Sequence, residues 1–193
     1  MAALRTPDAP VATSIVDPFN RHFLAIHQRW CRFTMLRLSM TAPAGLTILF
    51  ATCTGSALVL AEFAATTARS MGIPVRLIDA ATYDCRSLAK EGRILIITST
   101  HEGEPPSDAA DFFDEMDESQ VELAALEYAV VGLGDTAYDE FSAAAKRIDH
   151  RLEALGARRL GVRMDLDVHE GATGRNWIVE FMRTLTASYV KLK

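Results

Sequence analysis

The sequence predicts an α/β fold with a doubly wound parallel sheet, and three observations support this. Apolar runs alternate with segments of helical periodicity from Leu46 onward. Several runs, such as 94–97 and 129–131, are apolar at every position, which is typical of strands buried on both faces. Gly72 and Gly156 follow two of the predicted helices, where glycine often ends a helix. Five such strand–helix units favour the doubly wound class.

The predicted strands are 46–51, 74–79, 93–99, 127–133 and 159–163. The predicted helices are 56–71, 107–118, 138–155 and 174–186, with a weaker one near 84–90. In such a sheet, ligands bind beyond the carboxyl ends of the strands. The loops after the first, third and fourth strands are therefore expected to meet at one edge and to form the functional site.

Composition and charge narrow the class of protein. The 193 residues are expected to form an N-terminal extension, 1–45, and one domain, 46–193. No apolar run is long enough to span a membrane. Cys31, Cys53 and Cys85 lack metal spacing and favour a reducing compartment, so we expect a cytoplasmic protein without a metal site. The net charge of −5 argues against nucleic acid; it suits a basic protein partner or serves solubility alone.

The N-terminal extension is expected to contain a basic amphipathic helix over 18–38. Asp17-Pro18 is a helix start, with aspartate as the N-cap and proline at the first helical position. The apolar stripe of this helix consists of Phe19, Phe23, Ile26, Trp30 and Phe33. We expect it to pack on the domain or on a second copy, which would give a dimer. An organelle presequence, a membrane-surface helix and a chain start at Met35 or Met40 stay open as alternatives.

The turn after the first strand carries the strongest single pattern. An apolar strand leads directly into a turn rich in hydroxyls and glycine, and a helix follows at once. Backbone N–H groups and the positive end of the helix dipole then meet at one point, which makes an anion site. Thr52, Thr54 and Ser56 add hydroxyl donors, and Gly55 allows a close approach of the backbone. The turn predicts a phosphate site; an ordinary turn without a ligand is the alternative.

The loop after the third strand, residues 99–107, is expected to cover one face of a flat ligand. Gly103 permits a positive φ, and Pro105-Pro106 stiffens the exit into the next helix. The alternative is an ordinary connecting loop in which His101 is a solvent-exposed side chain.

The loop after the fourth strand, residues 131–141, is expected to cover the other face. Gly132 and Gly134 allow close backbone approach, and Tyr138 is expected at the start of a helix, where an aromatic ring can stack on a planar ligand. The alternative places Tyr138 and Phe141 in the core. We favour the core for Phe141 and the ligand for Tyr138.

Together these loops resemble those of flavodoxin-type FMN domains, most of all those of the diflavin reductases such as the sulfite reductase flavoprotein, and of small relatives of the MioC kind. The family's phosphate loop, T-x-T-G-x-A, is matched by Thr52, Thr54, Gly55 and Ala57. Its strand-three loop, S-T-x-G-E-G-E-P-P, is matched by Ser99, Thr100, Glu102, Gly103, Glu104, Pro105 and Pro106. Its strand-four motif, G-L-G-D-x-x-Y-x-x-F, is matched in full by residues 132–141. The resemblance covers about 140 residues, from 46 to 185.

The resemblance implies a flavodoxin-like five-stranded sheet of order 2-1-3-4-5, here with an extra N-terminal helix, and FMN as the cofactor. It implies that the phosphate lies against 52–57 and that the ring lies between 99–103 and Tyr138. An acidic loop after the fifth strand, with Asp165, is expected nearby. The implied FMN-binding residues are Thr52, Cys53, Thr54, Gly55, Ser56, Ala57, Ser99, Thr100, His101, Glu102, Gly103, Leu133, Gly134, Asp135, Tyr138, Phe141 and Asp165.

One departure from the family pattern concerns the strand-three loop, which is one glycine short because His101 is followed directly by Glu102. Some members of the family place an aromatic residue there, so either His101 serves in its place or that face of the ring stays more open. Acidic side chains are expected around the flavin, namely Glu102, Glu104, Asp135 and Asp165. They predict a low reduction potential for forming the anionic, fully reduced FMN, because like charges repel.

The resemblance implies an electron carrier more than a stand-alone enzyme. We expect an NADPH-dependent flavoprotein reductase as the donor and a redox acceptor protein that docks on an acidic face. That face consists of Glu102, Glu104, Asp108, Asp111, Asp114, Glu115, Asp117 and Glu118. A plain solvated helix face is the alternative. Two other functions are weighed: an FMN-dependent NAD(P)H:quinone-type oxidoreductase, and a flavodoxin-like binding protein without a redox role.

Overall fold

A computed structural model describes residues 45–167 and 169–190 of the chain. The predicted helix over 18–38, and with it the dimer expected through this helix, lies outside the described residues. Within them, no helix combines the length and apolar character that crossing a membrane requires.

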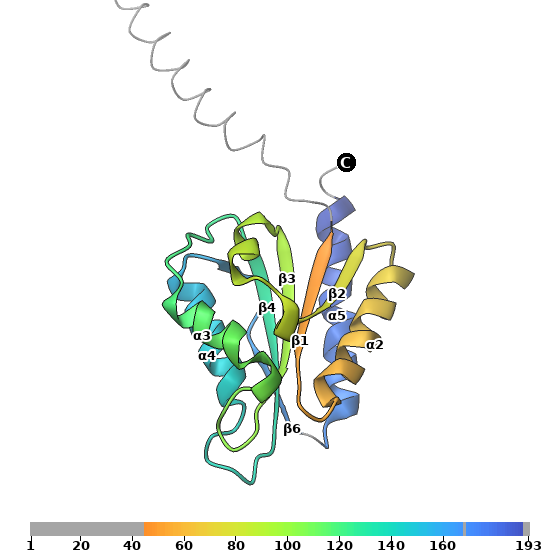
Figure 1. The fold of residues 1–193 in the computed structure, drawn as a ribbon. Helices are drawn as coiled ribbons and strands as arrows, with labels where there is room; N and C mark the ends of the chain where they lie inside the picture. Colours follow the sequence, from red (N-terminus) through yellow and green to blue (C-terminus); the bar gives the residue numbers. More distant parts are fainter. Residues whose placement is uncertain (1–44, 168, 191–193) are drawn as a thin grey trace, which may run out of the picture. The chain divides into compact units, whose positions relative to one another are not determined.

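The described domain is built on a parallel sheet of order β2-β1-β3-β4-β5, with β6 also paired to β4 (Figure 1). Its strands are β1 (Leu46–Ala51), β2 (Val75–Asp79), β3 (Arg93–Ser99), β4 (Glu127–Gly134), β5 (Arg158–Arg159) and β6 (Met164–Asp167). The predicted order 2-1-3-4-5 is confirmed. The central strands β1, β3 and β4 are buried along almost their whole length, as their apolar runs predicted.

Four α-helices cover the sheet, two on each face (Figure 1). They are α2 (Ser56–Ser70), α3 (Ala110–Glu118), α4 (Ala143–Ala154) and α5 (Gly171–Val190). The short 3₁₀ turns η1 (Ala80–Thr82) and η2 (Cys85–Lys90) lie between β2 and β3, and η3 (Ser107–Ala109) directly precedes α3. On the face of α2 and α5, Ile48, Ala61 and Ile178 belong to one apolar core. On the face of α3 and α4, Phe113 and Ile148 belong to a second. Each face of the sheet thus has its own buried layer.

The predicted fifth strand, 159–163, is wrong in its bounds. The structure has two short strands, β5 and β6, that both pair with β4. Arg159 at the end of β5 and Arg163 just before β6 donate hydrogen bonds to the buried carboxylate of Asp149, at 2.9–3.0 Å. This ion pairing draws the segment out of the ladder and leaves Val162 86% exposed. Asp165, expected in a loop after the strand, consequently lies within β6.

Four of the predicted helices also differ from the structure, and one of them, expected at 174–186, is the longer α5. The helix expected at 138–155 begins only at Ala143, because Ser142 before it has a left-handed φ of 54°. Tyr138 therefore lies in a loop and not at a helix start. The expected helix 107–118 opens with the 3₁₀ turn η3, and the weak helix near 84–90 is the 3₁₀ turn η2.

Candidate functional site

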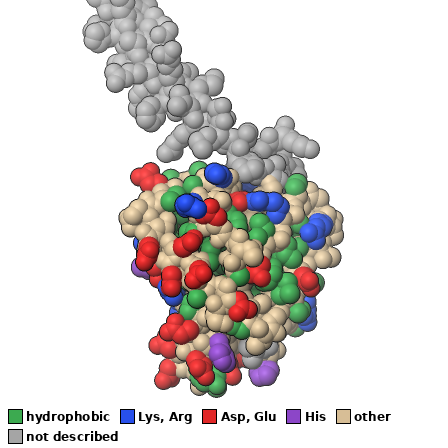
Figure 2. Space-filling view, viewed as in Figure 1, with side chains coloured by type: hydrophobic (Ala, Val, Ile, Leu, Met, Phe, Trp, Pro, Cys, Tyr) green, Lys and Arg blue, Asp and Glu red, His purple; other side chains and the backbone are tan. Residues whose placement is uncertain are grey.

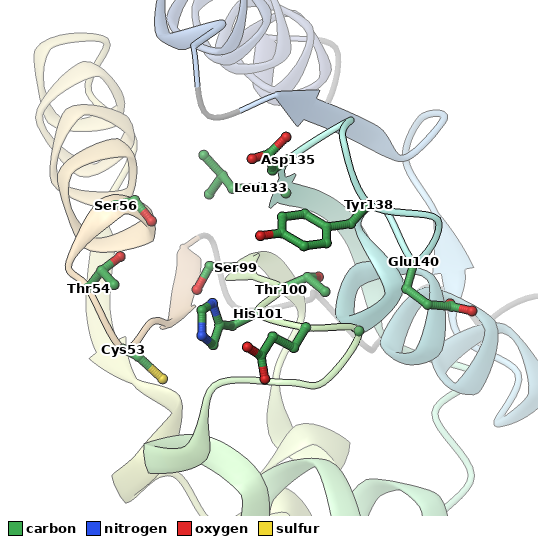
Figure 3. A pocket seen from close by; sticks show the side chains of 13 residues that line it. Cys53, Thr54, Ser56, Ser99, Thr100, His101, Leu133, Asp135, Tyr138 and Glu140 are labelled. Atoms are coloured by element: carbon green, nitrogen blue, oxygen red, sulfur yellow. The ribbon is translucent and has the colours of Figure 1, made fainter.

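A pocket of about 300 Å³ opens at the carboxyl ends of β1, β3 and β4, where three loops meet (Figure 3). It is lined by Cys53, Thr54, Ser56, Ser99, Thr100, His101, Glu102, Gly103, Leu133, Gly134, Asp135, Tyr138 and Glu140. The meeting of these loops at one edge is the arrangement that the strand order predicts.

The turn between β1 and α2 is shaped to receive an anion. Gly55, with φ 87°, stands directly before α2, and its N–H donates to the Thr52 hydroxyl at 3.0 Å. Gly55 occupies the N-cap position of α2 and has no side chain that could accept a hydrogen bond from the first N–H groups of the helix. These N–H groups can therefore donate to a ligand. The hydroxyls of Thr54 and Ser56 lie beside them (Figure 3). This donor set suits a phosphate group.

The loop after β3 forms a tight two-residue turn. The His101 N–H donates to the Glu104 carbonyl at 3.1 Å, and the Glu104 N–H donates back at 2.9 Å. The central residues, Glu102 and Gly103, both have positive φ, 52° and 84°. Such a turn usually carries Asn-Gly or Asp-Gly, and glutamate in the left-handed region is strained by about 1 kcal/mol. The loop that is one glycine short of the sequence pattern is thus a compact turn, and His101 at its start lines the pocket.

The loop after β4 presents an aromatic ring to the pocket from the other side. Tyr138 is 59% exposed, and its ring lies across the pocket from His101 (Figure 3). The Tyr138 N–H donates to the Asp135 carbonyl at 3.1 Å, and the Asp135 carboxylate accepts from the Ala137 N–H at 2.8 Å. A large aromatic side chain left this exposed has an open face on which a planar ligand can stack.

The glycines of β4 act differently from the prediction. A Cβ on Gly134 would lie 2.8 Å from the Ser142 backbone nitrogen and 3.0 Å from the Phe141 ring. A Cβ on Gly132 would lie 2.5 Å from the Cβ of Ala145. The absence of a side chain at these glycines therefore lets the start of α4 pack closely against β4. Phe141 packs against β4 and does not line the pocket.

Most of the predicted site residues line the pocket, but five do not. Thr52 and Gly55 are bonded to each other within the turn, and Ala57 is fully buried in the first turn of α2. Phe141 packs against Gly134, as described above. Asp165 is held by Arg163 at 2.8 and 2.9 Å.

Sequence reasoning missed one lining residue, Glu140. It lies two residues beyond Tyr138 in the same loop, and its Cβ and Cγ are 3.2 Å from the position that a Cβ on Gly103 would take. The two loops that flank the pocket therefore meet at this point. Its position in the strand-four motif was the available signal.

The pocket has an acidic surround. Glu102, Asp135 and Glu140 line it, and acidic side chains gather on the left and at the lower end of the face in Figure 2, around α3 and the pocket end of the sheet. Among residues 45–167 and 169–190, no cluster of histidine, cysteine or carboxylate side chains is arranged to hold a metal ion.

Comparison with known proteins agrees with this geometry. Residues 48–177 match the family model described as Flavodoxin. The sulfite reductase [NADPH] flavoprotein alpha-component of Photobacterium profundum is 40% identical over 141 residues, which is 72% of this chain and 23% of that protein. The same component of Vibrio parahaemolyticus is 37% identical over 161 residues, which is 80% of this chain and 26% of that protein. The chain thus spans about a quarter of the length of these relatives.

Solved structures agree as well. The Streptococcus pneumonia TIGR4 flavodoxin superposes with a TM-score of 0.68 at 27% identity, covering 75% of this chain and 99% of that one. Flavodoxin 2 from Bacillus cereus superposes with a TM-score of 0.66 at 25% identity, covering 76% of this chain and 99% of that one.

The doubly wound sheet with an anion turn and an exposed aromatic ring defines an FMN-binding electron-transfer domain. The chain belongs to the flavodoxin family. FMN is the cofactor of that family, and the described pocket fits it: donors for a phosphate stand at one end and an open aromatic face at the other.

Proposed function

We propose that this domain carries electrons between an NADPH-dependent flavoprotein reductase and an acceptor protein. The observation that carries the proposal is the exposure of Tyr138, which is 59% exposed at the mouth of the pocket. A ring stacked on this tyrosine keeps an edge at the protein surface, where a partner can approach it. The relatives are named as NADPH-dependent flavoprotein components of sulfite reductase, which supports a reductase as donor.

The residues proposed to hold FMN fall into two groups. The N–H groups at the start of α2, with the hydroxyls of Thr54 and Ser56, bind the phosphate. The turn at 101–104 and Tyr138 bind the two faces of the ring. FMN supplies the redox chemistry when bound, and these residues bind and orient it.

The acidic face is proposed as the docking surface for a basic partner. Glu102, Glu104 and Asp108 are exposed beside the pocket. Farther along α3, Arg147 pairs with Asp114 at 2.9 Å and with Asp117 at 2.7 Å, which neutralises part of the charge there. The carboxylates nearest the pocket therefore contribute most to steering a partner. The described cysteines, Cys53 and Cys85, are free thiols, which supports a reducing, cytoplasmic location.

The rate of electron transfer from a reductase to the FMN-loaded domain tests the proposal. We expect the rate to fall steeply as ionic strength rises, because exposed charges are screened. The charge reversal Glu104→Lys is expected to slow transfer at low salt, and the matched reversal Glu153→Lys, on the exposed end of α4, to change it little. A rate that is flat from low to high salt contradicts charge-guided docking. Rapid oxidation of NADPH by the domain alone contradicts the carrier function.

A further inference from the structure

The loop that carries Tyr138 has little apolar anchoring of its own. Every residue from 136 to 140 is exposed. Within the loop, Asp135 only closes the local turn, through its contacts with the Ala137 and Tyr138 N–H groups. A loop without buried side chains depends on hydrogen bonds to the rest of the domain for a fixed position.

Asp167, the last residue of β6, provides such hydrogen bonds. One carboxylate oxygen, Oδ2, accepts from both the backbone N–H and the hydroxyl of Thr136, at 3.0 and 2.7 Å. The other, Oδ1, accepts from the His169 N–H at 2.9 Å. We call these three hydrogen bonds the Asp167 tie. It joins the loop after β4 to the loop after β6, at the point where Gly134 and Asp167 end the pairing of the two strands.

The Asp167 tie is charge-assisted at ordinary pH. The Thr136 and His169 backbone N–H groups, and then the Thr136 hydroxyl, lower the pKa of Asp167 to about 2. The carboxylate is therefore ionised at neutral pH. Hydrogen bonds to an ionised acceptor are stronger than those between neutral groups.

Asp165, two residues earlier in β6, does not contribute in this way. Its two carboxylate oxygens accept hydrogen bonds from the guanidinium of Arg163, two residues earlier in the chain. The sequence pattern pointed to Asp165 as the acid at the pocket, whereas the acid bonded to a pocket loop is Asp167.

We propose that Asp167 is a positioning residue for the cofactor: through Thr136 it fixes the loop that holds the Tyr138 ring in place to stack on the flavin. The inference rests on FMN binding at the proposed site. It assigns Asp167 no contact with FMN, because Asp167 does not line the pocket and acts two residues away from the ring.

The test uses the affinities of the full chain for FMN and for riboflavin, both measured by fluorescence titration. Riboflavin lacks the phosphate, so it reports on the ring end of the site alone. For Asp167→Ala we expect both affinities to fall by the same factor, roughly tenfold, as is typical for the loss of charge-assisted hydrogen bonds. Thr136→Val, which keeps the N–H but removes the hydroxyl, is expected to weaken both affinities by about threefold.

Two controls separate positioning from a general structural effect. Asp84→Asn alters another exposed aspartate that caps a turn, by accepting from the Arg86 N–H, and it is expected to leave both affinities unchanged. In the Tyr138→Ala background, Asp167→Ala is expected to have no further effect, because the residue through which it acts is gone.

Three results overturn the proposal: affinities within twofold of wild type in Asp167→Ala, a loss confined to FMN, or effects of Asp167→Ala and Tyr138→Ala that simply add. Failure of the proposed function is a different result, since then the wild-type chain itself does not bind FMN.

Discussion

The two ends of the pocket are built in different ways. At the phosphate end, a strand, a glycine with φ 87° and the first turn of α2 present backbone N–H groups, so the site is made by contiguous main chain. At the ring end, two separate loops, 101–104 and 135–140, present side chains. Hydrogen bonds between distant residues hold them: just before the first loop, the Thr100 N–H donates to the Leu133 carbonyl, and in the second loop Thr136 donates to Asp167. A site made by local backbone depends on the conformation of that backbone, whereas one made by assembled loops depends on each supporting contact between them.

The largest expected effect is at Gly55. Gly55→Val places a β-branched residue at a left-handed φ, which opens the turn and disperses the N–H groups. We expect the affinity for FMN to fall by roughly 30-fold or more, and that for riboflavin by much less, because opening the strained turn loses about 2 kcal/mol of anion binding. Fluorescence titration with both flavins measures this.

The matched control is Gly72→Val. Gly72 also has a positive φ, 75°, and a Cβ at this position would likewise meet open space, but it lies at the far end of α2. The substitution is expected to lower stability without changing the preference for FMN over riboflavin. Equal loss of that preference in both variants contradicts a phosphate site at Gly55.

At the ring end, Tyr138→Ala is expected to lower the affinities for FMN and for riboflavin by the same factor, about tenfold, because stacking on an aromatic ring contributes about 1–3 kcal/mol. Tyr138→Phe keeps the ring and is expected to keep most of the affinity. A loss for FMN with none for riboflavin would show that Tyr138 acts on the phosphate end instead.

The strained turn after β3 gives a smaller effect, on stability. Glu102→Gly relieves the left-handed glutamate, so the free energy of unfolding is expected to rise by about 0.5 kcal/mol in urea denaturation. Glu104→Gly removes the same charge two residues on, where φ is not positive, and is expected to lower stability. The idea of stored strain fails if both variants change stability in the same direction.

The smallest effect is in the dependence on pH. The pKa of Asp167 is lowered to about 2, so its contribution to stability is present above the unfolded value and is lost only as pH falls through about 2. Between pH 7 and pH 4, the NMR shift of its carboxyl carbon is expected to stay that of an ionised group. An aspartate with an ordinary pKa of about 3.9 would be nearly half protonated at pH 4, and that result contradicts the Asp167 tie.

The fold and the phosphate end were predictable because their signals are local. Fully apolar strands, the glycine that precedes α2 and the hydroxyls of Thr54 and Ser56 all occupy short stretches of sequence. Tyr138 was predicted as a ligand-facing ring for the same reason, since polar residues surround it.

The errors concern contacts between residues far apart in the chain. The split of the fifth strand follows from two arginines that bind Asp149 on α4, and no local pattern contains that pairing. The role proposed here for Asp167 was not predictable from a local pattern either, because only the fold brings Asp167 to Thr136, 31 residues earlier.

The central claim is that this domain is an FMN-loaded electron carrier. Its most direct test is the flavin absorbance near 450 nm of the anaerobic, FMN-loaded chain, recorded first with NADPH alone and then after addition of a catalytic amount of an NADPH-dependent flavoprotein reductase. The proposed function predicts a stable absorbance with NADPH alone and rapid bleaching once the reductase is present. Bleaching by NADPH alone, or a purified chain that retains no FMN under saturating conditions, contradicts it.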